Sequence, residues 1–272
     1  MNPWLFGIDL PLLGRFEVSA YFMWIVIGCV SAAHVVAREA ENEGEDAQGA
    51  LLLTIFAILG GSVGARLGHV PTSLDLYLDD PLRVLQFWRG GLVFYGGLIG
   101  GLLAGLLWCR IRGLRFLRMA DICAPAVAMG LAFGRLGCYS VGCCYGKPID
   151  WPLGIEWPWA ATFLGGQVPA ALRGIELHPT QNYATLGALA IFAAVALVRR
   201  RGEFEGQAIA SLLVLYGIWR SVLELFRFDA ARGFVLPEYL GQNLSTSQAV
   251  SIPMVLGGVL AYLWLRRRSR RR

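Results

Sequence analysis

Long apolar runs dominate the chain and are separated by short polar or basic stretches. Runs of about 20 residues, the length that crosses a bilayer as a helix, lie at 17–37, 50–70, 91–109, 119–138, 180–198, 206–226 and 248–265. The first and the sixth are the least sharply bounded. The pattern predicts an all-α, polytopic membrane protein with seven transmembrane helices, built as a single domain over residues 1–272.

The polar segments between the runs differ in character. Residues 147–177 contain four prolines and the tryptophans Trp151, Trp157 and Trp159, which favour an external loop resting on the membrane interface. We therefore expect a small external head over residues 139–178. The acidic stretch 39–46 is expected to be a solvated loop.

Composition and charge support a membrane protein over a nucleic-acid-binding one. The chain is 56% hydrophobic and 16% charged, with a formal net charge of +5, and its arginines cluster at 110–118, 199–201 and 266–272. Seven crossings place all three clusters on one side. The positive-inside rule then predicts a cytoplasmic C-terminus and an external N-terminus, and no nucleic-acid partner is expected. Residues 1–15 lack the features of a cleaved signal and are expected to stay in the mature protein.

Three arginines, Arg66, Arg135 and Arg220, fall inside apolar runs. A charge at that depth is costly, so each is expected to face the bundle interior and to hold an anion. Arginine binds phosphate through a planar, bidentate fork, which makes a phospholipid headgroup the natural ligand. The sequence has no Walker-type loop and no dinucleotide-binding fingerprint, so nucleotide chemistry is excluded.

Helical spacing groups several polar residues on common faces. Tyr216, Arg220, Glu224 and Arg227 are four, four and three residues apart, so Glu224 can pair with either arginine. A surface ion-pair stripe is the alternative. Glycines that recur every four residues in the third run, Gly97 among them, predict close helix packing.

Six cysteines fall into two groups. Cys29, Cys109 and Cys123 lie inside apolar runs and are expected to be small buried residues. The others, Cys138, Cys143 and Cys144, lie at the predicted outer face. A disulfide from Cys138 to one of its two neighbours is the simpler expectation for them, because a closed zinc site needs a fourth ligand, for which His178 is a candidate.

Several motifs resemble the phosphatidylglycerol-prolipoprotein diacylglyceryl transferase family, in the same order over nearly the whole chain. They are GRLG at 134–137 with Gly146, GGLVFYGGLIG at 90–100, HPTQNY at 178–183, YGIWR at 216–220 with Glu224 and Arg227, and SQ at 247–248. The resemblance implies an inner-membrane enzyme that moves diacylglycerol from phosphatidylglycerol to the lipobox cysteine thiol of a prolipoprotein, releasing glycerol 1-phosphate. It implies no metal or other cofactor, and we expect a monomer whose partners are phosphatidylglycerol and prolipoprotein signal peptides.

The resemblance, together with the positions of the polar residues in the apolar runs, assigns roles to residues. Arg135 and Arg220 match the functional arginines of the family and are expected to hold the charge of the departing phosphate. The expected substrate-binding residues are Tyr21, Arg66, Gly97, Gly134, Gly137, Gly146, His178, Gln181, Glu224 and Arg227.

The chain departs from the family pattern at its acid–base positions. Tyr95 stands where the family usually has histidine, and His69 stands where it commonly has tyrosine, as though the two had exchanged. Histidine is the side chain best suited to accept a proton near neutral pH, so His69 is the hypothesised acceptor of the thiol proton and Tyr95 a second catalytic candidate. The alternative makes His69 an interfacial residue and Tyr95 a hydrogen-bond donor to the lipid.

Further departures keep other functions open. Cys138 and Cys143 replace the usual Asn and Glu, and Ala184 replaces a Glu. One alternative is a family member with another lipid or thiol substrate. Another is a non-catalytic membrane protein that binds lipid, thiols or metal through the three clustered cysteines.

Overall fold

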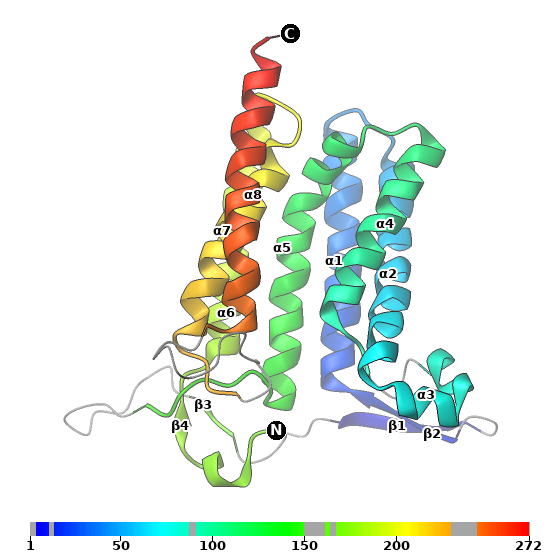
Figure 1. Ribbon diagram of the computed structural model, residues 1–272, viewed down its shortest axis with the longest axis vertical. Helices are drawn as coiled ribbons and strands as arrows, with labels where there is room; N and C mark the ends of the chain where they lie inside the picture. The colour runs from blue at the N-terminus through cyan, green and yellow to red at the C-terminus, as the bar shows by residue number, and fades with distance from the viewer. Residues whose placement is uncertain are drawn as a thin grey trace. The chain divides into compact units, whose positions relative to one another are not determined.

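Long helices account for most of the described chain (Figure 1). The computed structural model describes residues 4–10, 14–86, 91–149, 161–163, 167–229 and 244–271. The long helices are α1 (Ala20–Asn42), α2 (Ala47–His69), α4 (Phe94–Arg112), α5 (Phe116–Val141), α6 (Thr180–Arg200), α7 (Gln207–Glu224) and α8 (Thr246–Ser269). Within these described ranges, six helices, all of this set except α7, are long and apolar enough to cross a membrane. The chain is therefore a multi-pass membrane protein.

Helix α7 coincides with the sixth predicted run but is not one of these six. Its 18 residues include Arg220 and Glu224, whose charges lower its mean hydropathy. The count of seven spans and the orientation of the termini stay predictions.

Two small antiparallel sheets correct the all-α prediction. Strand β1 (Trp4–Leu10) pairs with β2 (Gly14–Ser19), so the first helix begins at Ala20 and not at residue 17. The run Arg-Phe-Glu-Val-Ser at 15–19 alternates polar and apolar residues, the period of a strand. Strand β3 (Ala161–Thr162) pairs with β4 (Glu176–Leu177).

Short elements complete the described part of the chain. Helix α3 (Leu74–Asp79) lies between two 3-10 turns, η1 (Val70–Thr72) and η2 (Pro81–Leu85), and a third turn, η4 (Ala170–Leu172), precedes β4. The predicted interfacial tryptophans Trp151, Trp157 and Trp159 lie outside the described residues.

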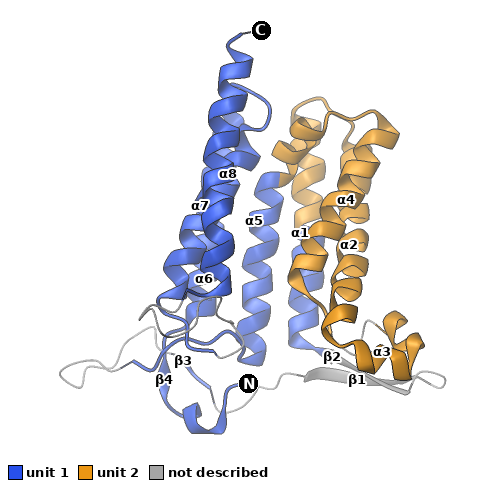
Figure 2. Ribbon diagram, in the orientation of Figure 1, with its two compact units in different colours: residues 1–31, 124–272 blue, residues 32–123 orange. Residues whose placement is uncertain are grey.

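The chain divides into two compact units (Figure 2). Unit 1 contains residues 1–31 and 124–272, and unit 2 contains residues 32–123. The boundaries fall within α1 and α5.

In unit 2, helices α2 and α4 pack backbone to backbone through glycines. A Cβ atom at Gly64 would lie 2.3 Å from the carbonyl oxygen of Gly96, and one at Gly100 would lie 2.3 Å from that of Gly60. Gly97 belongs to the same contact, because its Cβ position lies 3.2 Å from the Gly61 carbonyl oxygen. The predicted close packing through the glycines of the third run is confirmed.

The acidic stretch 39–46, expected to be a solvated loop, forms ion pairs and caps a helix. Arg118 Nε lies 2.5 Å from Glu45 Oε1, and Arg112 Nη2 lies 3.5 Å from Asp46 Oδ2. Asp46 also caps α2, since its Oδ1 accepts a hydrogen bond from the Gly49 N–H at 2.8 Å. That bond, assisted by Arg112, lowers the pKa of Asp46. Arginines at the end of α4 and at the start of α5 thus bind the loop between α1 and α2.

In unit 1, small residues let the helices approach closely. Ala124 and Ala128 of α5 form a core with Ile191 and Val195 of α6 and with Ala208 and Leu212 of α7. The Trp219 ring lies directly over Gly187 of α6, leaving no room for a side chain there. This packing brings the ends of α5, α6 and α7 to one place.

Candidate functional site

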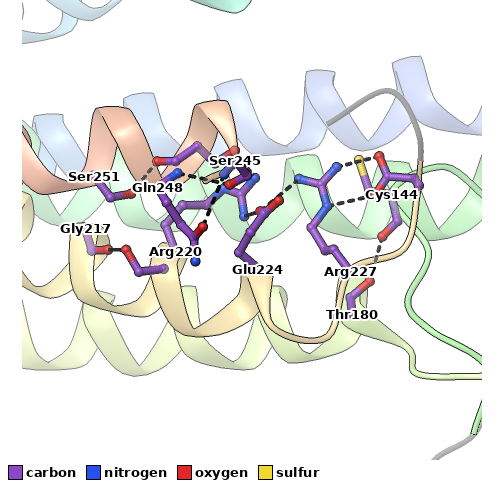
Figure 3. A network of polar contacts seen from close by, with 12 residues as sticks. Cys144, Thr180, Gly217, Arg220, Glu224, Arg227, Ser245, Gln248 and Ser251 are labelled. Carbon is purple, nitrogen blue, oxygen red and sulfur yellow. Dashed lines mark hydrogen bonds and ion pairs between the residues drawn. The ribbon is translucent and has the colours of Figure 1, made fainter. Parts of the chain in front are cut away.

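Four buried charged residues meet at the C-terminal end of α7, where Figure 3 shows three of them in succession. They are Arg220, Glu224, Arg227 and Asp229, each at most 8% exposed. Arg220 Nη1 donates to Glu224 Oε2 at 2.7 Å, and the same oxygen lies 4.0 Å from Arg227 Nη1. Arg227 donates through Nε and Nη2 to the two carboxylate oxygens of Asp229, at 2.8 and 2.6 Å. The predicted pairing of Glu224 with its neighbouring arginines is confirmed.

Arg135 of α5 joins this charged group from another helix. Its guanidinium faces the Tyr216 hydroxyl, one turn before Arg220, and lies within electrostatic range of Arg220 itself. The group then contains three guanidinium groups, from Arg135, Arg220 and Arg227, and two carboxylates, from Glu224 and Asp229. Their charges sum to one net positive charge. A phosphodiester carries one negative charge at neutral pH, so the group matches that anion in charge.

The first turn of α8 binds Nη2 of Arg220, the terminal nitrogen that does not contact Glu224. Ser245 caps the helix by accepting from the Gln248 N–H at 3.2 Å, and the Gln248 side chain accepts from the Ser245 N–H at 3.3 Å. This capping box fixes the first turn. Ser247, within that turn, accepts a hydrogen bond from Arg220 Nη2. Arg220 is thereby held between α7 and α8.

Arg227 is presented by a layer of three stretches that are far apart in the sequence. They are residues 145–148, 176–178 and 226–228. The Gly146 N–H donates to the His178 carbonyl at 3.1 Å, and the Lys147 N–H donates to the Phe226 carbonyl at 2.8 Å. A Cβ atom at Gly146 would lie 2.5 Å from the His178 carbonyl oxygen. Only glycine fits there, so Gly146 permits the backbone pairing that positions Arg227.

Three thiols converge beside the arginines. The Sγ atoms of Cys138, Cys143 and Cys144 all lie within 4.8 Å of one another, and all three cysteines are free. Thr180 Oγ1 donates to the Cys144 carbonyl at 2.6 Å, and Gln181 Nε2 donates to the Cys143 carbonyl at 2.7 Å. The start of α6 therefore fixes the backbone of two of the three cysteines. The expected disulfide is not formed in this structure.

Cys144 has an unusual backbone and an unusual electrostatic environment. Its φ of 57° is the only positive value for a non-glycine residue in the described ranges, a conformation that costs about 1 to 3 kcal/mol. Hydrogen bonds from the Cys138 and Cys143 thiols lower the pKa of the Cys144 thiol, and Arg135 and Arg227 lower it further. The backbone strain is held by the contacts on either side.

His178 is not part of this thiol cluster. Its Nδ1 lies 3.3 Å from the Tyr183 hydroxyl, and its ring packs on the edges of Tyr183 and Phe226. Burial lowers its pKa, and Lys147 lowers it further. Among the residues that the structure describes, the grouped metal-type ligands are the three cysteines alone. The suggestion that His178 completes a zinc site with them is therefore wrong.

Comparison with known proteins identifies the family. Residues 9–264 match the family described as prolipoprotein diacylglyceryl transferase. A phosphatidylglycerol–prolipoprotein diacylglyceryl transferase of Geobacter sulfurreducens is 34% identical over 265 residues, 94% of each chain. The proteins of that name from Clostridium tetani and Rhodospirillum rubrum are 29% and 36% identical, covering 90% and 79% of this chain and 92% and 75% of their own. The chain belongs to the prolipoprotein diacylglyceryl transferase family.

The residues expected from this family divide between the two units. Unit 1 holds Arg135, Arg220, Glu224, Arg227, Gly146, His178 and Gln181, together with Tyr21, Gly134 and Gly137. The Tyr21 ring covers Gly137, since a Cβ atom there would lie 2.9 Å from Tyr21 Cδ2. A Cβ atom at Gly134 would meet only Ile25 Cδ1, at 3.9 Å, among the described residues.

The other expected residues of the family lie in unit 2, where Arg66 has a structural environment. It is 4% exposed, and its Nε and Nη1 donate to the carbonyls of Val84 and Gly91 at 3.2 and 3.1 Å. Its Nη2 donates to the Arg83 carbonyl, and its guanidinium lies over the Tyr77 ring. Arg66 thus fastens the loop between α2 and α4.

The two acid–base candidates of this transferase-family chain have different surroundings within unit 2. His69 Nδ1 lies 2.8 Å from the Tyr77 hydroxyl, and its Nε2 lies 3.4 Å from Ser73 Oγ. Tyr95 is 40% exposed and packs its ring on the edge of Phe94. Both ring nitrogens of His69 therefore have partners that hold α3.

Two residues of the site, Asp229 and Ser247, were not predicted from the sequence. The Asp229 carboxylate accepts hydrogen bonds from Arg227 Nε and Nη2. The sequence indicated this contact only by placing a carboxylate two residues after an arginine. Ser247 holds Arg220 and lies in the quoted Ser-Gln motif, which signals a helix start. Neither contact follows helical spacing, so the pattern on α7 could not reveal them.

Two buried acceptors near the arginines have no hydrogen-bond partner among the described residues. They are Glu224 Oε1 and Gln181 Oε1. A buried acceptor without a partner is unfavourable by about 1 to 3 kcal/mol. Both atoms are therefore suited to receive hydrogen bonds from hydroxyl groups of a ligand.

Proposed function

We propose that the protein transfers the diacylglyceryl group from phosphatidylglycerol to the lipobox cysteine thiol of prolipoproteins and releases glycerol 1-phosphate. The observation that carries the proposal is the buried pair Arg220 and Arg227, joined by the half-buried Arg135, because this group keeps one positive charge after its two carboxylates are counted. Relatives that cover nearly the whole chain carry the name of this activity.

The main requirement of the reaction is to stabilise the negative charge that develops on the leaving phosphate. The thiolate sulfur forms a bond to the glycerol carbon, the carbon–oxygen bond to phosphate breaks, and the leaving glycerol 1-phosphate takes the electron pair. Arg135 and Arg220 hold the phosphate as its charge grows, an effect that is strong where water is excluded. Arg227, already bound by Asp229 on two arms, orients Glu224 and adds positive potential.

The headgroup contains hydroxyls that match the unpaired acceptors. Phosphatidylglycerol differs from other common phospholipids by its terminal glycerol, whose hydroxyls can donate hydrogen bonds. Glu224 Oε1 is buried and without a partner in the part of the chain that the structure describes. We assign Glu224 to the recognition of that glycerol.

The placement in the cell follows from the distribution of arginine. Seven spans, with α7 as the sixth, would put the C-terminus in the cytoplasm and the N-terminus outside. We further propose, from the resemblance to the family, that the protein is a monomer of the inner membrane. The site at the end of α7 then opens toward the outer leaflet, where a secreted prolipoprotein presents its cysteine.

The thiol must also lose a proton. His69 and Tyr95 remain the candidates for this step, because they stand where the family pattern usually has tyrosine and histidine. In unit 2, however, both ring nitrogens of His69 already have partners.

Complementation tests the function directly. A bacterial strain depleted of its own diacylglyceryl transferase should grow when this chain is expressed. Its purified form should move labelled diacylglycerol from phosphatidylglycerol to a lipobox peptide, and a peptide with serine in place of cysteine should receive none. A chain that inserts normally but gives neither result has another lipid or thiol substrate, or binds without catalysis.

A further inference from the structure

The convergence of three thiols at the anion site is the feature that the transfer reaction leaves unused. Cys138 comes from the last turn of α5, and Cys143 and Cys144 come from the turn that follows it. Their Sγ atoms lie within 4.8 Å of one another, and each is half-buried and free. Three thiolates at such separations can share one thiophilic metal ion after small side-chain rotations.

We propose that Cys138, Cys143 and Cys144 bind one zinc ion whose fourth position takes the thiol of the prolipoprotein substrate. This inference rests on the proposed function, because it assigns the acceptor thiol of that reaction to the open position. Three protein ligands with one open position are typical of catalytic zinc, whereas structural zinc has four protein ligands.

The backbone around the thiols is fixed as a ligand set requires. Thr180 and Gln181, 3% and 1% exposed, donate to the carbonyls of Cys144 and Cys143 at 2.6 and 2.7 Å. These contacts keep Cys144 in its left-handed conformation, with φ of 57°. Two adjacent cysteines in extended backbone point their side chains to opposite sides, so the left-handed residue lets both sulfurs reach one point.

Two arginines lie close to the thiol cluster. Zinc with three thiolates carries one net negative charge, and Arg135 and Arg227 both lie within electrostatic range of Cys144. The same arginines belong to the proposed phosphate site. A thiol bound at the fourth position would therefore be held beside the phosphate ester that it must displace.

Zinc would supply the deprotonation that the histidines of unit 1 do not provide. The chain has three histidines, and only His178 belongs to unit 1, where it faces Tyr183. A thiol that coordinates a metal ion loses its proton. The substrate S–H bond breaks with its proton passing to water, and the sulfur keeps the electron pair that then forms the bond to carbon.

Metal content is the first test and does not depend on turnover. The full-length protein, purified under reducing conditions and loaded with zinc, should retain about one ion per chain. Cys143→Ser and Cys138→Ser should lose it, whereas Cys29→Ser, a control in α1 outside the cluster, should keep it. Zinc should also protect the three cysteines of the unmutated chain from alkylation, as read by mass spectrometry, which needs no variant to fold.

The open position has its own readout. In the cobalt-substituted protein, a lipobox peptide with cysteine should change the visible absorption and add a sulfur-to-metal band, while the serine peptide should not. The metal site would be overturned if the protein retained no zinc, or if Cys143→Ser retained as much zinc as the unmutated chain. It would also be overturned if two of the three cysteines were joined as a disulfide in the protein purified under reducing conditions. A cobalt spectrum unmoved by the thiol peptide would overturn the open position.

The two proposals can fail separately. Complementation by a chain that retains no zinc, with activity that resists chelators, would remove the metal site and leave the transferase. Stoichiometric zinc in a chain that does not transfer diacylglycerol would leave the metal site and remove the function.

Discussion

Both compact units contain a buried arginine on a long helix, and they use it differently. In unit 2, Arg66 gives its donors to the main-chain carbonyls of Arg83, Val84 and Gly91. In unit 1, Arg220 gives its donors to the Glu224 carboxylate and to Ser247. The first arginine meets backbone groups that no substrate can replace, and the second meets side chains that a ligand can rearrange.

The partners of a buried guanidinium separate a structural arginine from a functional one. A guanidinium that donates to loop carbonyls supplies hydrogen bonds that irregular backbone lacks. Such bonds stabilise a loop inside the membrane, where no water is present to supply them. A guanidinium that shares carboxylates with its neighbours forms a charged group, and the total charge of that group decides what it binds. Arg135 supplies the surplus charge in unit 1, and it is the sharpest point at which to test the comparison.

Replacing Arg135 should produce the largest effect on turnover. Arg135→Ala should lower kcat roughly 100- to 1,000-fold, the usual result of removing one donor to a developing oxyanion. The measurement is diacylglyceryl transfer to a lipobox peptide in phosphatidylglycerol vesicles. Arg135→Lys should recover little, because lysine lacks the planar fork.

The matched control is Arg201→Ala, which removes an exposed arginine beyond the C-terminal end of α6. Its turnover should equal that of the unmodified protein. Equal turnover by Arg135→Ala and Arg201→Ala would remove Arg135 from the proposed chemistry.

Replacing Arg66 should act on stability and not on the chemical step. Arg66→Met removes the guanidinium donor from three loop carbonyls, of which, among the described residues, only that of Arg83 also accepts from a backbone N–H, that of Gln86. A carbonyl left buried without a partner costs about 1 to 3 kcal/mol. We expect a clear fall in Tm in detergent, with most of the turnover per folded molecule retained. A normal Tm with a collapse of kcat would show that both arginines act on the substrate and that the comparison is wrong.

How much of this could be predicted from the sequence follows from the range of each interaction. The predicted run 50–70 lies almost wholly within α2, and the Arg220–Glu224 pair is confirmed, because both depend on local helical period. The Arg227–Asp229 pair and the three carbonyls that bind Arg66 depend on loop paths, which no period encodes. The convergence of Cys138 with Cys143 depends likewise on the turn at Gly142, where φ is 71°.

The glycine contact of unit 2 offers a third test, of intermediate size. Gly64→Ala places a Cβ atom 2.3 Å from the Gly96 carbonyl oxygen, so α2 and α4 must separate, at a cost of about 1 to 3 kcal/mol. Gly105→Ala is the control on α4, because the atom nearest to its added Cβ would be Leu53 Cδ1, at 3.6 Å. Thermal unfolding of both variants should show a loss for Gly64→Ala alone. Equal Tm values would mean that the two helices do not meet through their backbones.

The smallest expected effect is that of His69→Gln, and it decides which unit supplies the proton acceptor. His69 Nδ1 lies 2.8 Å from the Tyr77 hydroxyl in unit 2, so its replacement should lose one hydrogen bond, worth roughly 0.5 to 1.5 kcal/mol of stability. If the thiol loses its proton at the cysteine cluster, the pH profile of transfer from pH 6 to 9 should keep its shape in this variant and in Tyr95→Phe. A profile that moves in His69→Gln alone would restore His69 as the base. Higher activity in Tyr95→His would instead make position 95 the site of proton transfer, and the charged group of unit 1 would then serve the phosphate only.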